Sequence, residues 1–330
     1  MAVTDRRNRA MQPFIPNSKL IFTLPLGMKI MKGNIIITGQ IGVSGVSVAG
    51  TQLAEGGPVG LVKQIYVTAT PANGSRYPGG MIVNCTPRSL LRYAIAQHNG
   101  KYISEINAST LGAGANGTYN IYLSIPIYWA DTTLRNAVGT SLNADPANYA
   151  SIQVEVDTGD LTSCFVGNNG TVNWSGLTVQ WADERADLPG DTLVLYQEDH
   201  AMLIAATFPR AVDYAMPQDG SFCSWTILQE QGIYATLSNA LLQRVTIQGA
   251  NLTYDKYTYD IQQQDLDDEW LDPATPITGW AHIDFTDSAL QNIVPAQGLT
   301  AQFQVTNVSG ANLDDLRFYT RRVLAALPSN

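Results

Sequence analysis

The chain has 330 residues, of which 14% are charged, and its formal net charge at pH 7 is -9. This length suits two domains of ordinary size, and the acidic balance argues against a protein that coats nucleic acid, so no sequence-specific nucleic-acid partner is expected. Glycine, asparagine, threonine, serine and proline are plentiful, which is typical of β-sheets joined by long turns rather than of helical bundles. No apolar leader and no run of about 18 apolar residues occurs, which predicts synthesis in a reducing cytoplasm without secretion or a membrane span.

Residues 1–18 are basic, contain two prolines and lack the two-residue alternation of a strand. They are predicted to form an arm that is either frayed or ordered by a partner. Arg6, Arg7 and Arg9 outnumber Asp5, so the arm is positive while the rest of the chain is strongly acidic. Because no strand is predicted there, its removal is expected to leave the fold intact.

A first β-rich unit is predicted over residues 19–185. Residues 20–24, 34–38, 62–70 and 119–128 are apolar, β-branched or alternating runs bounded by turn residues, as strands are. The segment 112–117 has the spacing of a dinucleotide-binding loop, G-x-G-x-x-G. That loop requires a strand before it and a helix after it, and here a strand follows, so the glycines are interpreted as a loop.

One segment of the first unit has the pattern of a helix. Thr86 is a suitable N-cap and Pro87 suits the first helical position. Leu90, Leu91, Ala94 and Ile95 then form an apolar stripe at helical spacing. This helix is expected to cover the open end of a sheet sandwich.

A charged, turn-forming stretch at residues 182–190 marks the boundary between two units. We assign residues 186–200 to a linker and residues 201–330 to a second β-rich unit. Its strands are predicted near residues 222–228, 241–248, 253–261, 280–285, 300–306 and 316–324.

The two halves share short sequence blocks in the same order. The matches are residues 62–67 with 242–247, 131–138 with 287–294, 152–154 with 303–305, and 177–181 with 316–320. The second pair reads Asp-[Thr/Ser]-x-Leu-x-Asn-x-Val, in which the aspartate is a natural helix N-cap. Each block is weak alone, but their common order indicates one β-rich unit used twice. Asp131 and Asp287 are therefore expected at equivalent helix starts.

Residues that carry chemistry are sparse. The cysteines Cys85, Cys164 and Cys223 are odd in number and widely spaced, so they predict buried free thiols rather than a disulfide framework or a zinc site. The three histidines form no paired metal motif. We therefore expect no enzyme, and we assign no catalytic residue and no cofactor.

An acidic segment is the one candidate for a metal site. Its carboxylates are Asp265, Asp267, Asp268, Glu269 and Asp272. Clustered oxygen ligands suit calcium, but the ligand order and central glycine of an EF-hand are missing. A solvated acidic loop is the favoured interpretation, with calcium binding as the alternative.

Two tandem all-β units with eight short strands each, and short helices in the loops, fit the jelly-roll architecture. In this architecture and its duplicated blocks, the chain resembles the double jelly-roll major capsid proteins of tailless, membrane-containing icosahedral dsDNA phages. The tectiviruses, corticoviruses and autolykiviruses are the relatives in question, with adenovirus hexon more distant. The resemblance covers nearly the whole chain and rests on architecture, not on a signature motif.

The resemblance implies a structural subunit of the virion, made in the host cytoplasm, that forms homotrimers. Such trimers are pseudo-hexagonal capsomers of an icosahedral shell, in contact with neighbouring capsomers and minor capsid proteins. It also implies that the N-terminal arm lies inside the shell. Arg6, Arg7 and Arg9 would there face acidic lipid headgroups of an inner membrane, or a neighbouring subunit.

A glycan-binding tandem β-sandwich, as in a phage receptor-binding or adhesion protein, is the alternative function. It requires aromatic side chains on an exposed face or loop. Trp174, Trp270 and Tyr257 are the candidates, and the competing interpretation places them in the core or at its rim.

Overall fold

The computed structural model describes residues 4–44, 52–53, 57–97, 117–129, 140–166, 171–187, 193–205, 211–232, 236–249, 252–267, 278–285, 294–310 and 313–324. The chain divides into two compact units. Unit 1 consists of Met1–Arg92, Ile103–Ala130 and Ser141–Thr192, and unit 2 of Tyr93–Tyr102, Asp131–Thr140 and Leu193–Asn330.

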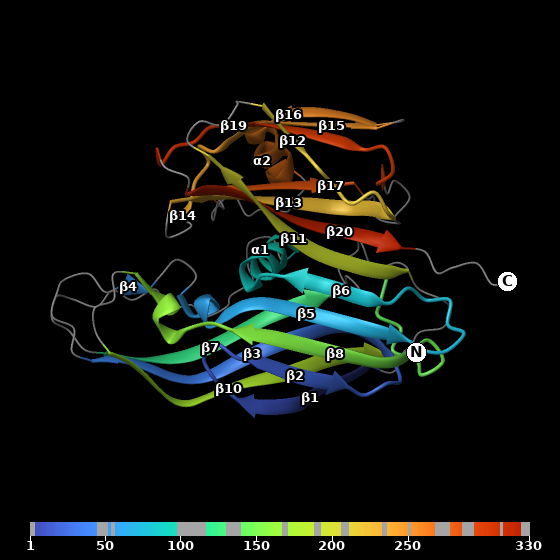
Figure 1. Cartoon of the computed structure of the whole chain (residues 1–330), viewed down its shortest axis with the longest axis vertical. Coiled ribbons are helices and arrows are strands. Elements are labelled where there is room, and N and C mark those ends of the chain that lie inside the picture. The colour runs from blue at the N-terminus through green and yellow to red at the C-terminus, as the bar shows by residue number, and fades with distance from the viewer. Residues whose placement is uncertain are drawn as a thin grey trace. The chain divides into compact units, whose positions relative to one another are not determined.

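Unit 1 contains two antiparallel sheets (Figure 1). The first has the strand order β1 (Thr4–Pro13), β10 (Thr171–Ala186), β3 (Lys29–Ser44), β7 (Gly117–Tyr128). The second has the order β6 (Gly80–Cys85), β5 (Val62–Pro71), β8 (Tyr149–Thr158), β2 (Lys19–Leu24). Strands β4 (Gln52–Leu53) and β9 (Phe165–Val166) form a short extra pair, and the 3₁₀ turns η1 (Gly57–Leu61) and η2 (Leu161–Cys164) lie in the connections.

The sheets of unit 1 form because alternate side chains are apolar and turn to a common core. In β2, Leu20, Phe22 and Leu24 are buried while the residues between them are exposed. One close contact fixes the identity of a residue in β3. A Cβ atom on Gly33 would lie 2.0 Å from Cη2 of Trp181 on the neighbouring strand β10, so the Trp181 ring occupies the space that any other side chain would need.

Trp181 also anchors a buried polar group in unit 1. Its Nε1 donates to Oδ2 of Asp183 at 3.2 Å, and Asp183 forms an ion pair with Arg185 at 3.0 Å. Arg185 also donates to the carbonyl oxygen of Pro25 at 2.6 Å. The ion pair is nearly inaccessible to solvent, and a buried pair of this kind is costly to break because it leaves an uncompensated charge.

Unit 2 repeats the arrangement. One sheet has the order β12 (Ala211–Tyr214), β19 (Thr300–Val305), β15 (Leu242–Gly249), β16 (Leu252–Tyr257). The other begins β11 (Val194–Ile204), β20 (Asp314–Leu324), β13 (Ser221–Gln231). The short strands β14 (Thr236–Leu237), β17 (Trp280–Asp284) and β18 (Val294–Pro295) pair with β13.

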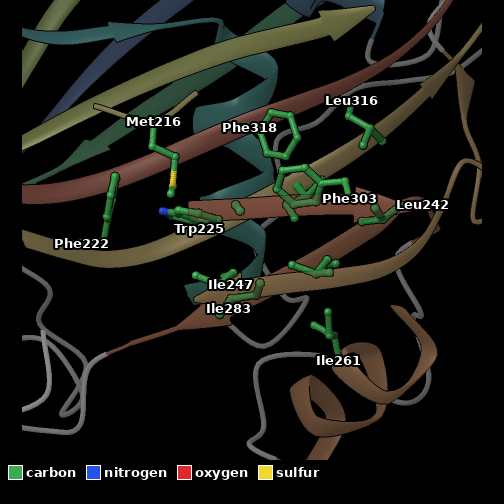
Figure 2. Close-up of a cluster of buried hydrophobic side chains, with 14 of the residues drawn as sticks. Met216, Phe222, Trp225, Leu242, Ile247, Ile261, Ile283, Phe303, Leu316 and Phe318 are labelled. Atoms are coloured by element: carbon green, nitrogen blue, oxygen red, sulfur yellow. The ribbon is translucent and has the colours of Figure 1, made fainter. Parts of the chain in front are cut away.

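The core of unit 2 is rich in aromatic rings (Figure 2). Phe303 of β19 and Phe318 of β20 come from different sheets and lie 4.7 Å apart between ring centroids, and Tyr214 stacks on Phe318 at 4.3 Å. Ile261, on helix α2 (Thr258–Asp267), belongs to the same cluster. Large rings bridge the two sheets, and α2 contributes to the core they share.

The two units have the same topology. In order, β1, β10, β3 and β7 of unit 1 correspond to β11, β20, β13 and β17 of unit 2. Likewise β2, β8, β5 and β6 correspond to β12, β19, β15 and β16. A helix follows the last strand of the second set in each half, α1 (Pro87–Gln97) after β6 and α2 after β16. The prediction of two tandem eight-stranded jelly rolls with short helices in the loops is confirmed.

The matched sequence blocks fall on corresponding strands. Residues 62–67 lie in β5 and 242–247 in β15, residues 152–154 in β8 and 303–305 in β19, and residues 177–181 in β10 and 316–320 in β20. Asp131 and Asp287 lie outside the described residues, so their equivalence stays a prediction.

Helix α1 begins as predicted. The side chain of Thr86 accepts a hydrogen bond from the backbone N–H of Ser89 at 3.4 Å, so Thr86 caps the helix. Leu90, Leu91 and Ala94 are buried, which confirms those members of the apolar stripe.

The expectation that residues 1–18 contain no strand is wrong. Strand β1 pairs with β10 in register from Thr4↔Ala186 to Pro13↔Thr178. The register shifts between Asn8 and Ala10, and such a bulge breaks the two-residue alternation by which a strand is recognised. Because β1 is an edge strand of its sheet, it also needs fewer apolar residues than a central strand.

Two further segments differ from the sequence prediction. The expected linker at 186–200 contains the start of β11, which pairs with β20 from Val194↔Leu324. The first residues of β11 are buried on both faces, so the sequence shows no alternation of apolar and polar residues there.

The expected acidic loop begins as the end of α2, which includes Asp265 and Asp267. Asp268, Glu269 and Asp272 lie outside the described residues.

Candidate functional site

Strand β1 carries the arginines that the sequence selected for assembly. Arg6 forms an ion pair with Glu184 of β10 at 3.1 Å, and Arg7 pairs with Asp5 at 2.8 Å. The two arginine side chains remain 76% and 67% exposed. Arg9 lies in β1, but its side chain is outside the described part. Because both side chains are largely exposed, Arg6 and Arg7 are accessible to a partner. Surface ion pairs of this kind also contribute little to stability.

The surroundings of β1 combine a sheet edge with exposed apolar side chains. Within the described chain, β1 pairs on one side only, with β10. Met11, Ile15 and Ile21 are exposed nearby in the sequence, and the side chain of Gln12 donates to the carbonyl oxygen of Ile21 at 2.7 Å, which ties β1 to β2. An edge strand offers unpaired backbone groups to another chain, and exposed apolar side chains favour such a contact. We call the surface formed by β1, Ile15 and Ile21 the β1 surface.

A second group of polar residues is buried in unit 2, where the sequence did not reveal it. The guanidinium of Arg321 lies over the ring of Tyr93 at 4.4 Å and donates to its hydroxyl. Tyr319 donates to Oε1 of Gln197 at 2.7 Å. Burial lowers the pKa of Arg321 to about 9. These residues come from α1, β11 and β20, so their proximity is a product of the fold.

His282 lies in the same region of unit 2. Its Nδ1 is 2.9 Å from the hydroxyl oxygen of Thr226, and its ring stacks on Trp280 at 5.7 Å. Burial lowers the pKa of His282 to about 3, so the imidazole is neutral at ordinary pH. A neutral histidine enclosed without access to solvent suits a structural role better than proton transfer.

The three thiols are buried and poorly placed for chemistry. Cys85, Cys164 and Cys223 are free and buried, which confirms that prediction. Burial raises the pKa of Cys164 and of Cys223 to about 12. A thiol, unlike a thiolate, is a poor nucleophile and metal ligand.

Among the described residues, no group of three or more histidine, cysteine, aspartate or glutamate residues could hold a metal ion. No helix among them is long and apolar enough to cross a membrane. Calcium binding at the acidic segment stays a hypothesis, because the side chains of all five carboxylates lie outside the described part of the chain.

Two of the three aromatic candidates are on the surface. Trp174 of β10 and Tyr257 of β16 are each 48% exposed, whereas Trp270 lies outside the described residues. Trp174 borders a hollow of about 490 Å³ at the ends of β3, β7 and β10. Tyr257 lies on the sheet of unit 2 that also lines a hollow of about 690 Å³. Neither residue is in the core.

No protein-family model matches the sequence, and no curated protein matches it either. Solved structures do match, over almost the whole chain. STIV MCP aligns with a TM-score of 0.66 at 12% identity, covering 99% of this chain and 98% of that one. The major capsid protein P2 from bacteriophage PM2 gives 0.58 at 9% identity, covering 98% of each chain. A chain of the PBCV-1 virus capsid gives 0.60 at 9% identity, covering 98% of this chain and 94% of that one. At such low identities the likeness is one of fold, and the fold of this chain is the double jelly roll of viral capsid proteins.

Proposed function

We propose that this chain is a viral major capsid protein, a structural subunit located in the virion shell. The observation that carries the proposal is the extent of the structural likeness. The match to the PM2 major capsid protein covers 98% of both chains, so it includes both jelly rolls in the same order. A shared single jelly roll would be weak support, since that architecture serves many functions. A shared tandem pair that accounts for nearly every residue is a more restrictive feature.

A shell subunit acts through its surfaces and not through a reactive centre. Its buried thiols and its enclosed His282 are consistent with that role, because these groups stabilise a fold and do not meet a substrate. We accordingly propose a structural protein without catalytic activity.

The proposed assembly is a homotrimer that forms a pseudo-hexagonal capsomer, with neighbouring capsomers and minor capsid proteins as partners. The β1 surface supports contact with another protein chain, since β1 pairs on one side only among the described residues and apolar side chains are exposed beside it. Arg6 and Arg7 are exposed beside it. We favour a neighbouring subunit as the partner of this surface, and acidic lipid of an inner membrane is the alternative partner of the arginines.

The test is the assembly state of the purified full chain. Native mass spectrometry should give a trimer, and negative-stain electron microscopy under conditions that promote assembly should show hexagonal tiles or closed shells. A chain that stays monomeric at every concentration, and that forms neither tiles nor shells with its neighbouring virion proteins, would rule out the capsid function. Anionic vesicles added to the trimer separate the two partners of the arginines, because only lipid binding requires the anionic headgroup.

A further inference from the structure

We propose that the outward face of the β12–β19–β15–β16 sheet of unit 2 is a binding site for a neutral carbohydrate. The inward face of this sheet bears Val245, Ile247 and Phe303, which belong to the hydrophobic core. The outward face therefore bears the residues between them, such as Arg244, Thr246 and Gln302. We call this the outer face of unit 2. Its strands are labelled in Figure 1.

At one end of this face is a pair of exposed aromatic rings. Tyr257 and Tyr259 are stacked with centroids 5.9 Å apart and an interplanar angle of 21°. They are 48% and 69% exposed, which is unusual for rings that could bury apolar area elsewhere. The C–H face of a sugar ring packs against such a surface, because it is apolar while its hydroxyl groups point outward from the ring edge.

Tyr257 of this pair is held in place by a charged neighbour. The guanidinium of Arg244 lies 5.3 Å from the Tyr257 ring centroid. Arg244 also binds Asp255 through two nitrogen atoms, with Nε donating to Oδ1 at 2.7 Å. The hydrogen bond from Arg244 lowers the pKa of Asp255. A side chain that is ordered before binding loses less conformational entropy when a ligand arrives.

Next to these rings a row of polar side chains crosses all four strands. The register aligns Asp255 with Thr246, Thr246 with Gln302, and Gln302 with Asp213. Thr246 donates to Oδ1 of Asp255 at 3.0 Å, and Gln302 donates to Oδ1 of Asp213 at 3.0 Å. The row supplies hydroxyl, amide and carboxylate groups, which can both donate to and accept from sugar hydroxyl groups.

The row continues into a hollow of suitable size. Thr246, Gln248, Thr300 and Gln302 line it, and its volume is about 690 Å³, within the range of small-molecule sites. Neither Tyr257 nor Tyr259 lines the hollow, but Thr246 does, and Thr246 is hydrogen-bonded to Asp255, the partner of Arg244. An oligosaccharide chain could therefore pack one sugar ring on the two tyrosines and extend its next units along the polar row to the hollow.

The charges of this face select the class of carbohydrate. Arg244 and Asp255 compensate each other, whereas Asp213 is hydrogen-bonded to a neutral amide. Among the described side chains of this face the balance is therefore negative, and the whole chain carries a net charge of -9. Acidic polysaccharides would be repelled. The geometry and charge together favour neutral hexose polymers.

The proposal is tested with the full chain and defined sugars. Isothermal titration calorimetry would use malto-, cello-, laminari- and manno-oligosaccharides at millimolar concentration, with oligogalacturonate as the acidic comparison. We expect at least one neutral series to bind and the acidic sugar not to bind. Tyr259→Ala and Gln302→Leu should each weaken binding at least tenfold. Tyr122→Ala is the matched control, because Tyr122 is a tyrosine of unit 1 that is 51% exposed, and it should leave affinity unchanged.

The outcomes separate the proposal from its competitors. Binding by none of the neutral sugars overturns it, and so does binding that Tyr259→Ala and Gln302→Leu leave intact while both variants melt like the unaltered chain. If Tyr259→Ala instead lowers the native mass of the assembly without any sugar binding, the outer face of unit 2 is a subunit contact and the proposal fails. Failure of the capsid function would appear separately, as a monomer without shells, whether or not sugars bind.

Discussion

At the scale of single residues, His282 makes unit 2 sensitive to acid. The folded protein holds this imidazole neutral, and burial lowers its pKa from 6.5 to about 3. The unfolded chain takes up the proton at the ordinary pKa, so between pH 6.5 and pH 3 the unfolded state binds more protons than the folded state. Stability that is present above this window is therefore lost as the pH falls through it, by up to about 1.4 kcal/mol per pH unit.

We expect His282→Gln to reduce that acid sensitivity. An amide can still bond to Thr226 but takes up no proton. Urea unfolding at pH 6.5 and at pH 4.5 should show a smaller loss of unfolding free energy in the variant than in the unaltered chain. Equal losses in the two proteins would mean that His282 does not titrate on unfolding.

Gly33 allows a second prediction at this scale. Gly33→Ala would place a methyl group against the Trp181 ring, where a Cβ would be only 2.0 Å from Cη2. Overpacking of this kind destabilises by about 1–3 kcal/mol. Gly42→Ala on the same strand is the matched control, since the nearest atoms to its Cβ would be 3.7 Å away. Chemical denaturation should separate the two variants clearly, and equal stabilities would contradict the contact.

At the scale of elements, strand β1 is part of the fold of unit 1. Deleting residues 2–12 would remove most of β1 and leave β10 without its neighbour from Ala186 to Val179. We expect a lower melting temperature for the deleted chain. The double variant Arg6→Gln, Arg7→Gln keeps the strand and removes only two exposed ion pairs, each worth up to about 1 kcal/mol.

The comparison of these two variants separates folding from assembly. Differential scanning calorimetry should show the double variant melting close to the unaltered chain, while particle yield should fall if the arginines contact a partner. Unchanged particle yield would remove Arg6 and Arg7 from the proposed contact. Normal melting of the deleted chain would show that β1 contributes little to unit 1.

The elements differ in how far the sequence predicts them. Strands β2 and β5 were recognisable because each has one buried and one exposed face, which produces alternation. Strand β1 was missed because its bulge breaks that alternation, and the start of β11 because both of its faces are buried. Helix α1 was predicted from its capping threonine and apolar stripe.

The candidate sites were predicted less well, for a different reason. Tyr257 was selected by residue type, but its partner Tyr259 was not, although two tyrosines two residues apart beside a charged pair are visible in the sequence. The polar row from Asp255 to Asp213 combines residues from four strands, and only the pairing register brings them together. The contact of Arg321 with Tyr93 depends on a sequence separation of 228 residues, which local patterns do not encode.

At the scale of the whole molecule, the proposed trimer predicts a dependence of stability on concentration. If subunits fold and associate together, dilution shifts the equilibrium toward unfolded monomer. Calorimetry over a hundred-fold range of concentration should show the melting temperature rising with concentration, and native mass should report the trimer at the upper end. A constant melting temperature together with a trimeric mass would indicate that association follows folding and does not contribute to it.

The pairing of first and last strands has a consequence for synthesis. Thr4 pairs with Ala186 in unit 1, and Val194 pairs with Leu324 in unit 2. The ribosome releases β1 long before β10 exists, so each jelly roll can close only when its last strand has been translated. Such long-range closure makes folding slow, and a waiting strand is at risk of pairing with other nascent chains. Two nascent copies of β1 that paired with each other would bring the exposed Arg6 and Arg7 of both chains together, and we expect this like-charge repulsion to disfavour that particular pairing.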